Sequence, residues 1–167
     1  MSKISFILGL FAFMAIGAGG ENLELTDDAQ RALKIHNDAR AEVGIAPLIW
    51  STELSKQAQD YARRLAKMGK LVHSKSTSDG ENLYWCSWEA DAPFTQASQS
   101  WYDEVNVYRY RKCCGPNWIK TGHYTQMIWE STTAVGMGMA VSSNGETYVV
   151  ARYNPPGNYV GKYPYRK

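Results

Sequence analysis

Four side chains of this 167-residue chain could do chemistry together: His73, His123, Glu81 and Glu104. Glu104 lies on the same side of a predicted helix as Trp101 and should point inward, where an unpaired carboxylate is costly. Imidazole rings can supply that pairing, or they can hold a divalent metal through their ring nitrogens. The residue types alone leave both possibilities open, a set of satisfied structural histidines or a metal site.

Three amphipathic helices should position these residues. The first is predicted over residues 26–44, where a threonine can cap the start and a glycine ends the helix. The second is predicted over residues 51–69, with a capping serine and a terminal glycine. The third follows Pro93, which suits a first helical turn, and runs to about Tyr108. Apolar residues recur at helical spacing in each, so each should pack one face on a core.

The pattern changes after Gly122, and three strands are predicted. They cover His123–Glu130, Val135–Val141 and Thr147–Tyr153, and Asn144-Gly145 is a strong signal for a tight hairpin between the last two. Glu81 is expected in a loop ahead of the third helix. Helices followed by antiparallel strands predict an α+β fold in which the helices pack on the sheet.

The first twenty residues have the composition of a signal peptide. A basic Lys3 precedes the apolar run Ile4–Ile16, and small residues follow at Gly17–Gly20. The apolar run is shorter than the roughly 20 residues that a bilayer-spanning helix needs. We therefore predict a cleaved signal over residues 1–20, a single domain over residues 21–167, and secretion to the extracellular space.

The charge balance argues against a nucleic-acid-binding protein. Lys and Arg total 18 and Asp and Glu total 16, which gives a formal net charge of +2 at pH 7. Nucleic-acid binding needs a clustered basic footprint, and the sequence offers only a mildly basic tail. We expect no nucleic-acid partner.

The three cysteines are Cys86, Cys113 and Cys114. Because a bond between adjacent residues is geometrically strained, Cys86 is expected to pair with Cys113 or Cys114. Cys86–Cys114 is the working assignment. One thiol is then left over, and it could join two copies of the chain as a homodimer.

Four motifs occur in order along the chain: His36–Arg40, Gly80–Leu83, Gly122–Thr132 and Tyr148–Tyr159. Together they resemble the signature motifs of the CAP superfamily, which comprises cysteine-rich secretory proteins, antigen 5 and pathogenesis-related protein 1. The resemblance extends over about residues 26–165. It is nearest in pattern to pathogenesis-related protein 1 and to the Golgi-associated members.

The resemblance implies an α-β-α sandwich with a central, mainly antiparallel sheet and a large cleft. It also implies a tetrad in that cleft. Glu81 and His123 match two of the motif boxes, and His73 and Glu104 match the other two members by position. In relatives the paired histidines can bind zinc, which makes zinc the implied cofactor. Carboxylates beside them would fix the orientation and tautomer of the rings.

The chain also departs from the plant-type pattern. Thr121, Met137 and Ala151 stand where plant-type members have cysteines, so most of that disulfide set is missing. No cysteine-rich extension follows the domain, which argues against block of ion channels. Other motif residues are expected to be structural: His36 and Arg40 share a helix face, and Gly136 and Gly138 should let a helix pack closely on a strand.

The resemblance favours a binding protein for lipid or sterol with a defence or immune-related role. The loop over residues 106–121 resembles the sterol-binding loop of relatives in position. Its aromatic residues with nearby cations would also suit a membrane surface. The lipid-binding candidates are Tyr108, Tyr110 and Trp118, with Arg109, Arg111 and Lys112 beside them.

Two other functions are compatible with the sequence. The chain could be an extracellular signalling or toxin-like ligand that acts through surface contacts. It could also be a metal-assisted hydrolase in which the cleft activates water. The second alternative is weaker, because the sequence has neither a G-x-S-x-G nucleophile elbow nor an H-E-x-x-H zinc-protease helix.

Overall fold

The computed structural model describes residues 25–75, 77–115 and 118–167. The predicted signal peptide over residues 1–20 lies outside them. Within these described ranges, no helix is long and apolar enough to cross a membrane.

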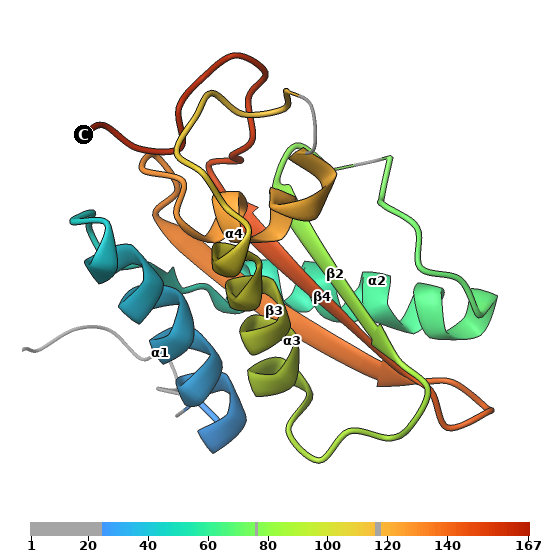
Figure 1. Cartoon of the computed structure of the whole chain (residues 1–167). Helices are drawn as coiled ribbons and strands as arrows, with labels where there is room; N and C mark the ends of the chain where they lie inside the picture. The colour runs from blue at the N-terminus through green and yellow to red at the C-terminus, as the bar shows by residue number, and fades with distance from the viewer. Residues whose placement is uncertain (1–24, 76, 116–117) are drawn as a thin grey trace, which may run out of the picture.

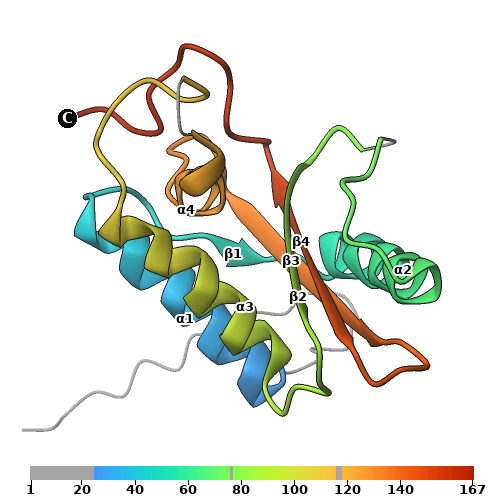
Figure 2. The ribbon, with the colours of Figure 1, turned by 45° about the vertical axis from the view of Figure 1, so that its right-hand side comes forward.

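The molecule has three layers, seen edge-on in Figure 2. Helices α1 and α3 cover one face of a four-stranded sheet and α2 covers the other (Figures 1 and 2). The strand order is β1-β3-β4-β2, in which β1 pairs with β3 in parallel and the other two pairings are antiparallel. The elements are α1 (Asp27–Glu42), β1 (Ile49–Trp50), α2 (Thr52–Met68), β2 (Gly80–Cys86), α3 (Pro93–Tyr102), the 3₁₀ turns η1 (Asp103–Asn106) and η2 (Trp118–Lys120), α4 (Gly122–Met127), β3 (Ala134–Val141) and β4 (Thr147–Asn154). The predicted α-β-α sandwich with a mainly antiparallel sheet is therefore confirmed.

Local signals set the ends of the long helices as predicted. The hydroxyls of Thr26 and Ser51 each accept a backbone N–H from the first turn of α1 and α2. Gly69 ends α2 in the left-handed region at φ +61°. Pro93 occupies the first turn of α3.

Three segments differ from the sequence prediction. Residues 122–127 form the helix α4 and not a strand, because the side chains of Tyr124–Met127 are all buried there and tertiary packing overrides β propensity. Glu81 lies in strand β2 and not in a loop, since Gly80–Cys86 pairs residue by residue with β4. The third helix also ends earlier than predicted, at Tyr102, and continues as the 3₁₀ turn η1.

The two glycines of β3 allow α2 to lie directly on the sheet. A Cβ on Gly136 would stand 2.4 Å from the backbone nitrogen of Ser55, and one on Gly138 would stand 2.2 Å from that of Gln59. The Gln59 side chain fixes the contact further by hydrogen-bonding the backbone of Met139. The sequence prediction of close helix packing at these glycines is confirmed.

His36 and Arg40 belong to the core, as predicted. The Arg40 guanidinium donates to four backbone carbonyls, which ties α1 to the segment around α4 (Ala46, Met127, Trp129 and Thr132). His36 Nδ1 donates to the carbonyl of Ala32, and its Nε2 accepts from the Tyr153 hydroxyl at 2.8 Å. Burial lowers the pKa of His36 to about 4, so the ring is neutral at physiological pH.

The structure contradicts the predicted disulfide from Cys86. Cys113 bonds Cys114, and Cys86 is a free, buried thiol. Cys86 ends β2, about 20 Å from the start of that strand. Cys113 packs instead on the C-terminal segment, donating its N–H to the carbonyl of Lys162. The leftover cysteine is thus Cys86, which is only 3% exposed and closed to a second copy of the chain.

Candidate metal and ligand cleft

A cavity of about 450 Å³ opens where β2 begins. Its lining includes His73, Glu81, Asn82 and His123, together with Trp118 and Asn158. Strand β2 is at the edge of the sheet, and Glu81 and Asn82 are successive residues whose side chains leave opposite faces of it. The cavity therefore receives groups from both layers of the sandwich.

Glu81 holds His73 on the α2 side. His73 Nδ1 lies 2.6 Å from Glu81 Oε1, and the same oxygen accepts the N–H of Ser74 at 3.0 Å. Arg152 of β4 lies directly opposite Glu81 in the sheet, and its Nη2 is 3.1 Å from Oε2. The side chains of Arg152 and Glu81 are 4% and 6% exposed, whereas that of His73 is 65% exposed. A buried ion pair thus supports an exposed imidazole.

Tyr61 of α2 holds the same segment from a second direction. Its ring lies under the Arg152 guanidinium, 5.2 Å from ring centre to Cζ. Its hydroxyl donates to the carbonyl of Val72, next to His73, at 2.8 Å. Helix α2, strand β4 and strand β2 together fix where this histidine stands.

Glu104 holds His123 on the α3 side. Its Oε1 lies 2.7 Å from His123 Nδ1, and its Oε2 accepts the N–H of Tyr124 at 2.9 Å. The imidazole is stacked on Trp101 of α3, with ring centres 6.1 Å apart. Asn82 of β2 donates to the His123 carbonyl at 3.1 Å. His123 is therefore fixed by η1, α3 and β2 at once.

The two histidine–glutamate pairs have the same chemical form. Each carboxylate can only accept, so in the neutral form of each ring Nδ1 carries the proton and Nε2 keeps a lone pair. Both rings line one cavity, with Glu81 also in its wall and Glu104 behind His123. Such rings have the tautomer that metal ligation through Nε2 requires.

The donor set fits a metal held by two imidazoles. Among the residues that the structure describes, no group of three or more His, Cys, Asp or Glu side chains is arranged to hold a metal ion. A zinc ion on His73 and His123 would complete its coordination with water or an incoming ligand. It would supply a Lewis-acidic positive centre in the cleft.

The predicted lipid-loop residues fall into two groups. Tyr108 packs on Tyr124, with ring centres 5.2 Å apart, and Tyr110 stacks on Tyr163 at 4.9 Å. These two rings hold the loop to the body and to the C-terminal segment. Trp118 is 41% exposed and lines the cavity, so it is the member of the set that a ligand could touch.

Sequence reasoning missed Arg152, Tyr61 and Gln126. Gln126 of α4 accepts the N–H of Gly157 at 3.0 Å, and a Cβ on Gly80 would stand 2.3 Å from its Oε1. It joins the start of β2 to the segment that follows β4. A signal for Arg152 was present, since a charged residue inside the apolar run of β4 needs a partner on the neighbouring strand.

The described site lies within a region that resembles a known protein family. The profile of the CAP: Cysteine-rich secretory protein family matches residues 33–153, most of the chain. The chain belongs to the CAP family. This match includes all four residues of the tetrad.

CAP relatives resemble the chain over nearly its whole length. Pathogenesis-related protein 1C of Nicotiana tabacum is 35% identical over 166 residues, covering 99% of this chain and 95% of the relative. Golgi-associated plant pathogenesis-related protein 1 of Homo sapiens is 38% identical over 134 residues, covering 78% and 84%. The names of these CAP proteins connect the chain with defence.

A solved CAP structure supports the same fold. The crystal structure of NaASP2 with Zn²⁺ is 27% identical in sequence, with a TM-score of 0.76, and covers 89% of this chain and 90% of that one. Zinc is thus present in a crystal of a similar protein.

Proposed function

We propose that this CAP protein is a secreted, defence-related binding protein whose cleft takes zinc on His73 and His123 and a lipid or sterol beside Trp118. The observation that carries the proposal is the pair of imidazoles that line one cavity, each with a glutamate oxygen at its Nδ1. The Zn²⁺ crystal of a similar protein supports the metal. The plant pathogenesis-related relatives support the defence role and secretion.

The lipid part rests on the cavity's size and lining. A volume of about 450 Å³ falls within the range of small-molecule sites. The lining combines the apolar side chains of Trp118, Ile119 and Pro156 with polar ones that include His73 and Asn82. That combination suits an amphipathic molecule, whose apolar body would lie on Trp118 while its polar end meets the histidines. The structure therefore favours Trp118 over Tyr108 and Tyr110 as the lipid contact.

The proposal is tested by native mass spectrometry of the protein secreted from eukaryotic cells, with and without added zinc and sterol. The wild type should carry both adducts and lack residues 1–20. His73→Ala and His123→Ala should lose zinc, and Trp118→Ala should lose the lipid. Trp88→Ala is the matched control, because Trp88 is an exposed tryptophan that does not line the cleft.

Two outcomes would overturn the proposal. A bare mass after incubation with both ligands would favour an extracellular ligand that acts by surface contacts. Zinc retained in both histidine variants would place the metal elsewhere.

A further inference from the structure

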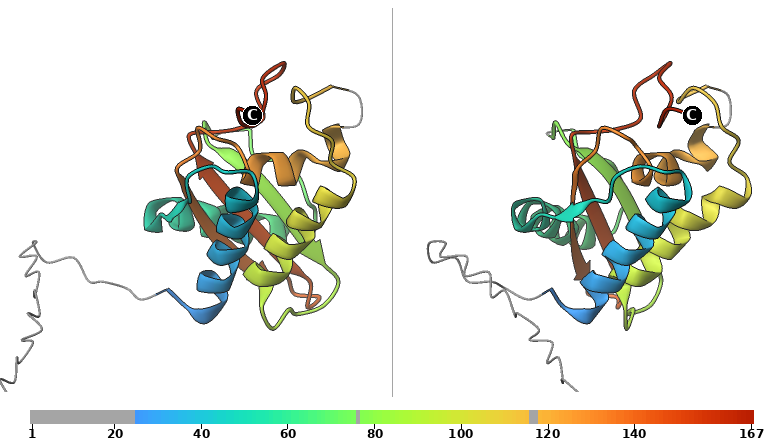
Figure 3. Two further views of the ribbon diagram at one scale, coloured as in Figure 1. Left: turned by 60° about the vertical axis from the view of Figure 1, so that its left-hand side comes forward. Right: turned by 90° about the vertical axis from the view of Figure 1, so that its left-hand side faces the viewer.

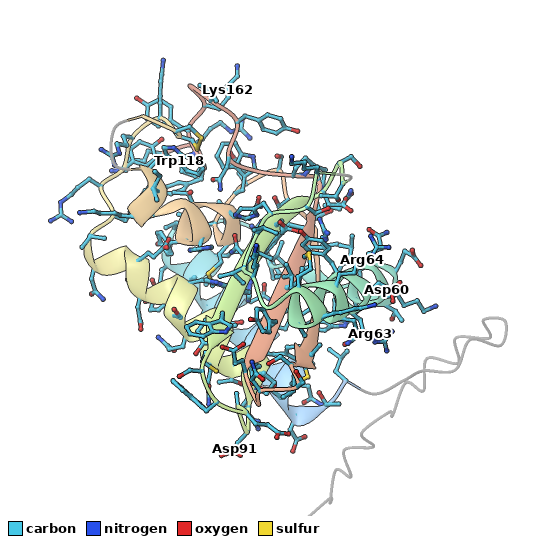
Figure 4. All side chains as sticks on the ribbon, turned by 90° about the vertical axis from the view of Figure 1, so that its right-hand side faces the viewer. Asp60, Arg63, Arg64, Asp91, Trp118 and Lys162 are labelled. Atoms are coloured by element: carbon cyan, nitrogen blue, oxygen red, sulfur yellow. A yellow bond between two sulfur atoms is a disulfide. The ribbon has the colours of Figure 1, made fainter. Side chains whose placement is uncertain are left out.

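The charges of this chain are separated along the molecule, which the net charge of +2 conceals. Residues 105–129 and 147–167 contain no Asp or Glu, and all acidic residues except Glu130 and Glu146 precede residue 105. Figure 4 shows the consequence: Trp118 and Lys162 lie at one end of the molecule and Asp91 lies at the other. We call the first the basic end; its unpaired cations among the described residues are Arg109, Arg111, Lys112, Lys120, Lys162 and Lys167, while Arg166 is paired with Glu130.

Two segments far apart in the sequence build the basic end. Cys113 donates its N–H to the Lys162 carbonyl, and Gly161 donates to the Cys113 carbonyl. The ring of Tyr110 is stacked on Tyr163 and its hydroxyl donates to the Tyr165 carbonyl at 2.8 Å. Figure 3 shows the C-terminal segment beside this loop in both views. The cations are therefore presented by a fixed surface and not by a loose tail.

A hollow of about 300 Å³ lies in this surface, and three cations line it. Arg109, Arg111 and Lys120 surround it, with Val107 and Thr121 completing the lining. No carboxylate belongs to the lining, so nothing in the hollow neutralises the three charges. Arg and Lys donors around a pocket of this size are the groups that bind phosphate oxygens.

Exposed aliphatic side chains belong to the two segments that build the basic end. Val107 is 58% exposed, Ile119 is 79% exposed and Val160 is 81% exposed. Cations interspersed with exposed apolar side chains are typical of a surface that lies in the headgroup region of an anionic bilayer.

We propose that the hollow between Arg109, Arg111 and Lys120 binds the phosphate of an anionic phospholipid and docks the basic end on a membrane surface. Val107 and Val160 then contact the acyl boundary. This site is separate from the cleft of the tetrad: no residue lines both cavities. It also differs from the lipid contact at Trp118, because it engages a bilayer and not a single molecule.

Vesicle co-sedimentation of the secreted protein tests the proposal, with phosphatidylcholine alone and with phosphatidylserine as about a third of the lipid. Binding to the anionic vesicles should be about 100-fold tighter and should weaken at about 0.5 M salt, where screening shortens to a few ångströms. Arg109→Glu/Arg111→Glu/Lys120→Glu should abolish it. Val107→Ser should weaken it by about tenfold, and Val107 lines the hollow and not the cleft.

The matched control is Arg63→Glu/Lys67→Glu/Lys70→Glu, which changes the net charge by the same amount on exposed residues at and just beyond the end of α2. At 0.1 M salt, which screens the long-range effect of net charge, the affinity of this control variant for anionic vesicles should be within about twofold of the wild-type affinity. Thermal unfolding of both triple variants checks that they fold. His73→Ala should bind vesicles as wild type does, so failure of the cleft proposal and failure of this one are distinguishable.

Three results would overturn the proposal. The control triple could weaken binding as much as the hollow triple, which would indicate net charge alone. Millimolar inorganic phosphate could abolish vesicle binding, which would indicate a site for a free anion. A single-stranded oligonucleotide could bind more tightly than anionic vesicles, which would indicate a nucleic-acid surface.

Discussion

Arg152 and Glu81 face each other across β4 and β2, with Nη2 and Oε2 3.1 Å apart, and both are nearly inaccessible to solvent. The pair lies behind His73, so the ring on the cavity wall depends on a charge inside the sheet. Among the residues that the structure describes, Arg152 Nε and Nη1 and Glu81 Oε2 find no hydrogen-bond partner. Glu81 is therefore the main compensation for this buried cation.

Arg152→Met is expected to destabilise the protein by about 3 kcal/mol, because it leaves the Glu81 carboxylate buried without its cation. Urea unfolding measures the change. Arg152→Met/Glu81→Gln should recover part of the loss, since the uncompensated charge is then gone. If the free energy of unfolding of Arg152→Met were within about 0.5 kcal/mol of the wild-type value, the ion pair would contribute little to stability.

Glu104→Gln is expected to weaken zinc binding by about 10–100-fold, as loss of a carboxylate behind a metal-binding histidine does. The neutral amide no longer favours the Nδ1–H tautomer of His123 as strongly and must also meet the Tyr124 N–H. Titration with a zinc-competing dye measures the affinity. Asp103→Asn removes an adjacent, exposed carboxylate and should change nothing; equal effects of the two variants would point to general electrostatics.

Gly138→Ala is expected to cost about 1–3 kcal/mol through overpacking. The added methyl would meet the backbone of α2 at Gln59, and backbone cannot rotate away as a flexible side chain can. Thermal or urea unfolding tests this. Gly115→Ala, where a Cβ meets nothing within 4 Å, is the control. If both substitutions were neutral, α2 would have to lie farther from β3 than the structure shows.

His36 should make the fold sensitive to acid. Its folded pKa of about 4 lies below the ordinary 6.5, so the unfolded chain binds the proton more readily. The sign follows from linkage: stability is complete above pH 6.5 and falls as the pH drops from 6.5 toward 4. The loss from this residue reaches about 2 kcal/mol at pH 5.

Urea unfolding between pH 7.5 and 5 tests this for wild type and His36→Gln. The variant is less stable at neutral pH, because the contacts to Ala32 and Tyr153 change. Its stability should nevertheless depend less on pH than that of wild type. If the free energy of unfolding depended on pH in the same way for both proteins, His36 would not be the source of the acid sensitivity.

The sequence by itself determined the features that depend on neighbouring residues. Thr26 and Ser51 cap helices, Gly69 ends one, and Asn144-Gly145 turns β3 into β4. These signals are local, because the hydrogen bonds and backbone angles involved lie within a few residues. The four motifs likewise indicated the family and the members of the tetrad before any coordinates.

Only the tertiary structure decided how the tetrad is supported. Glu81 meets Arg152 because β2 and β4, some seventy residues apart in the chain, pair in one register. His123 lies on a helix because burial around α4 outweighs the β propensity of its sequence. Cys86 and Cys113 stand at opposite ends of the domain, so the sequence argument against an adjacent pair could not settle which cysteines meet. Each outcome depends on contacts between distant segments, which no local pattern encodes.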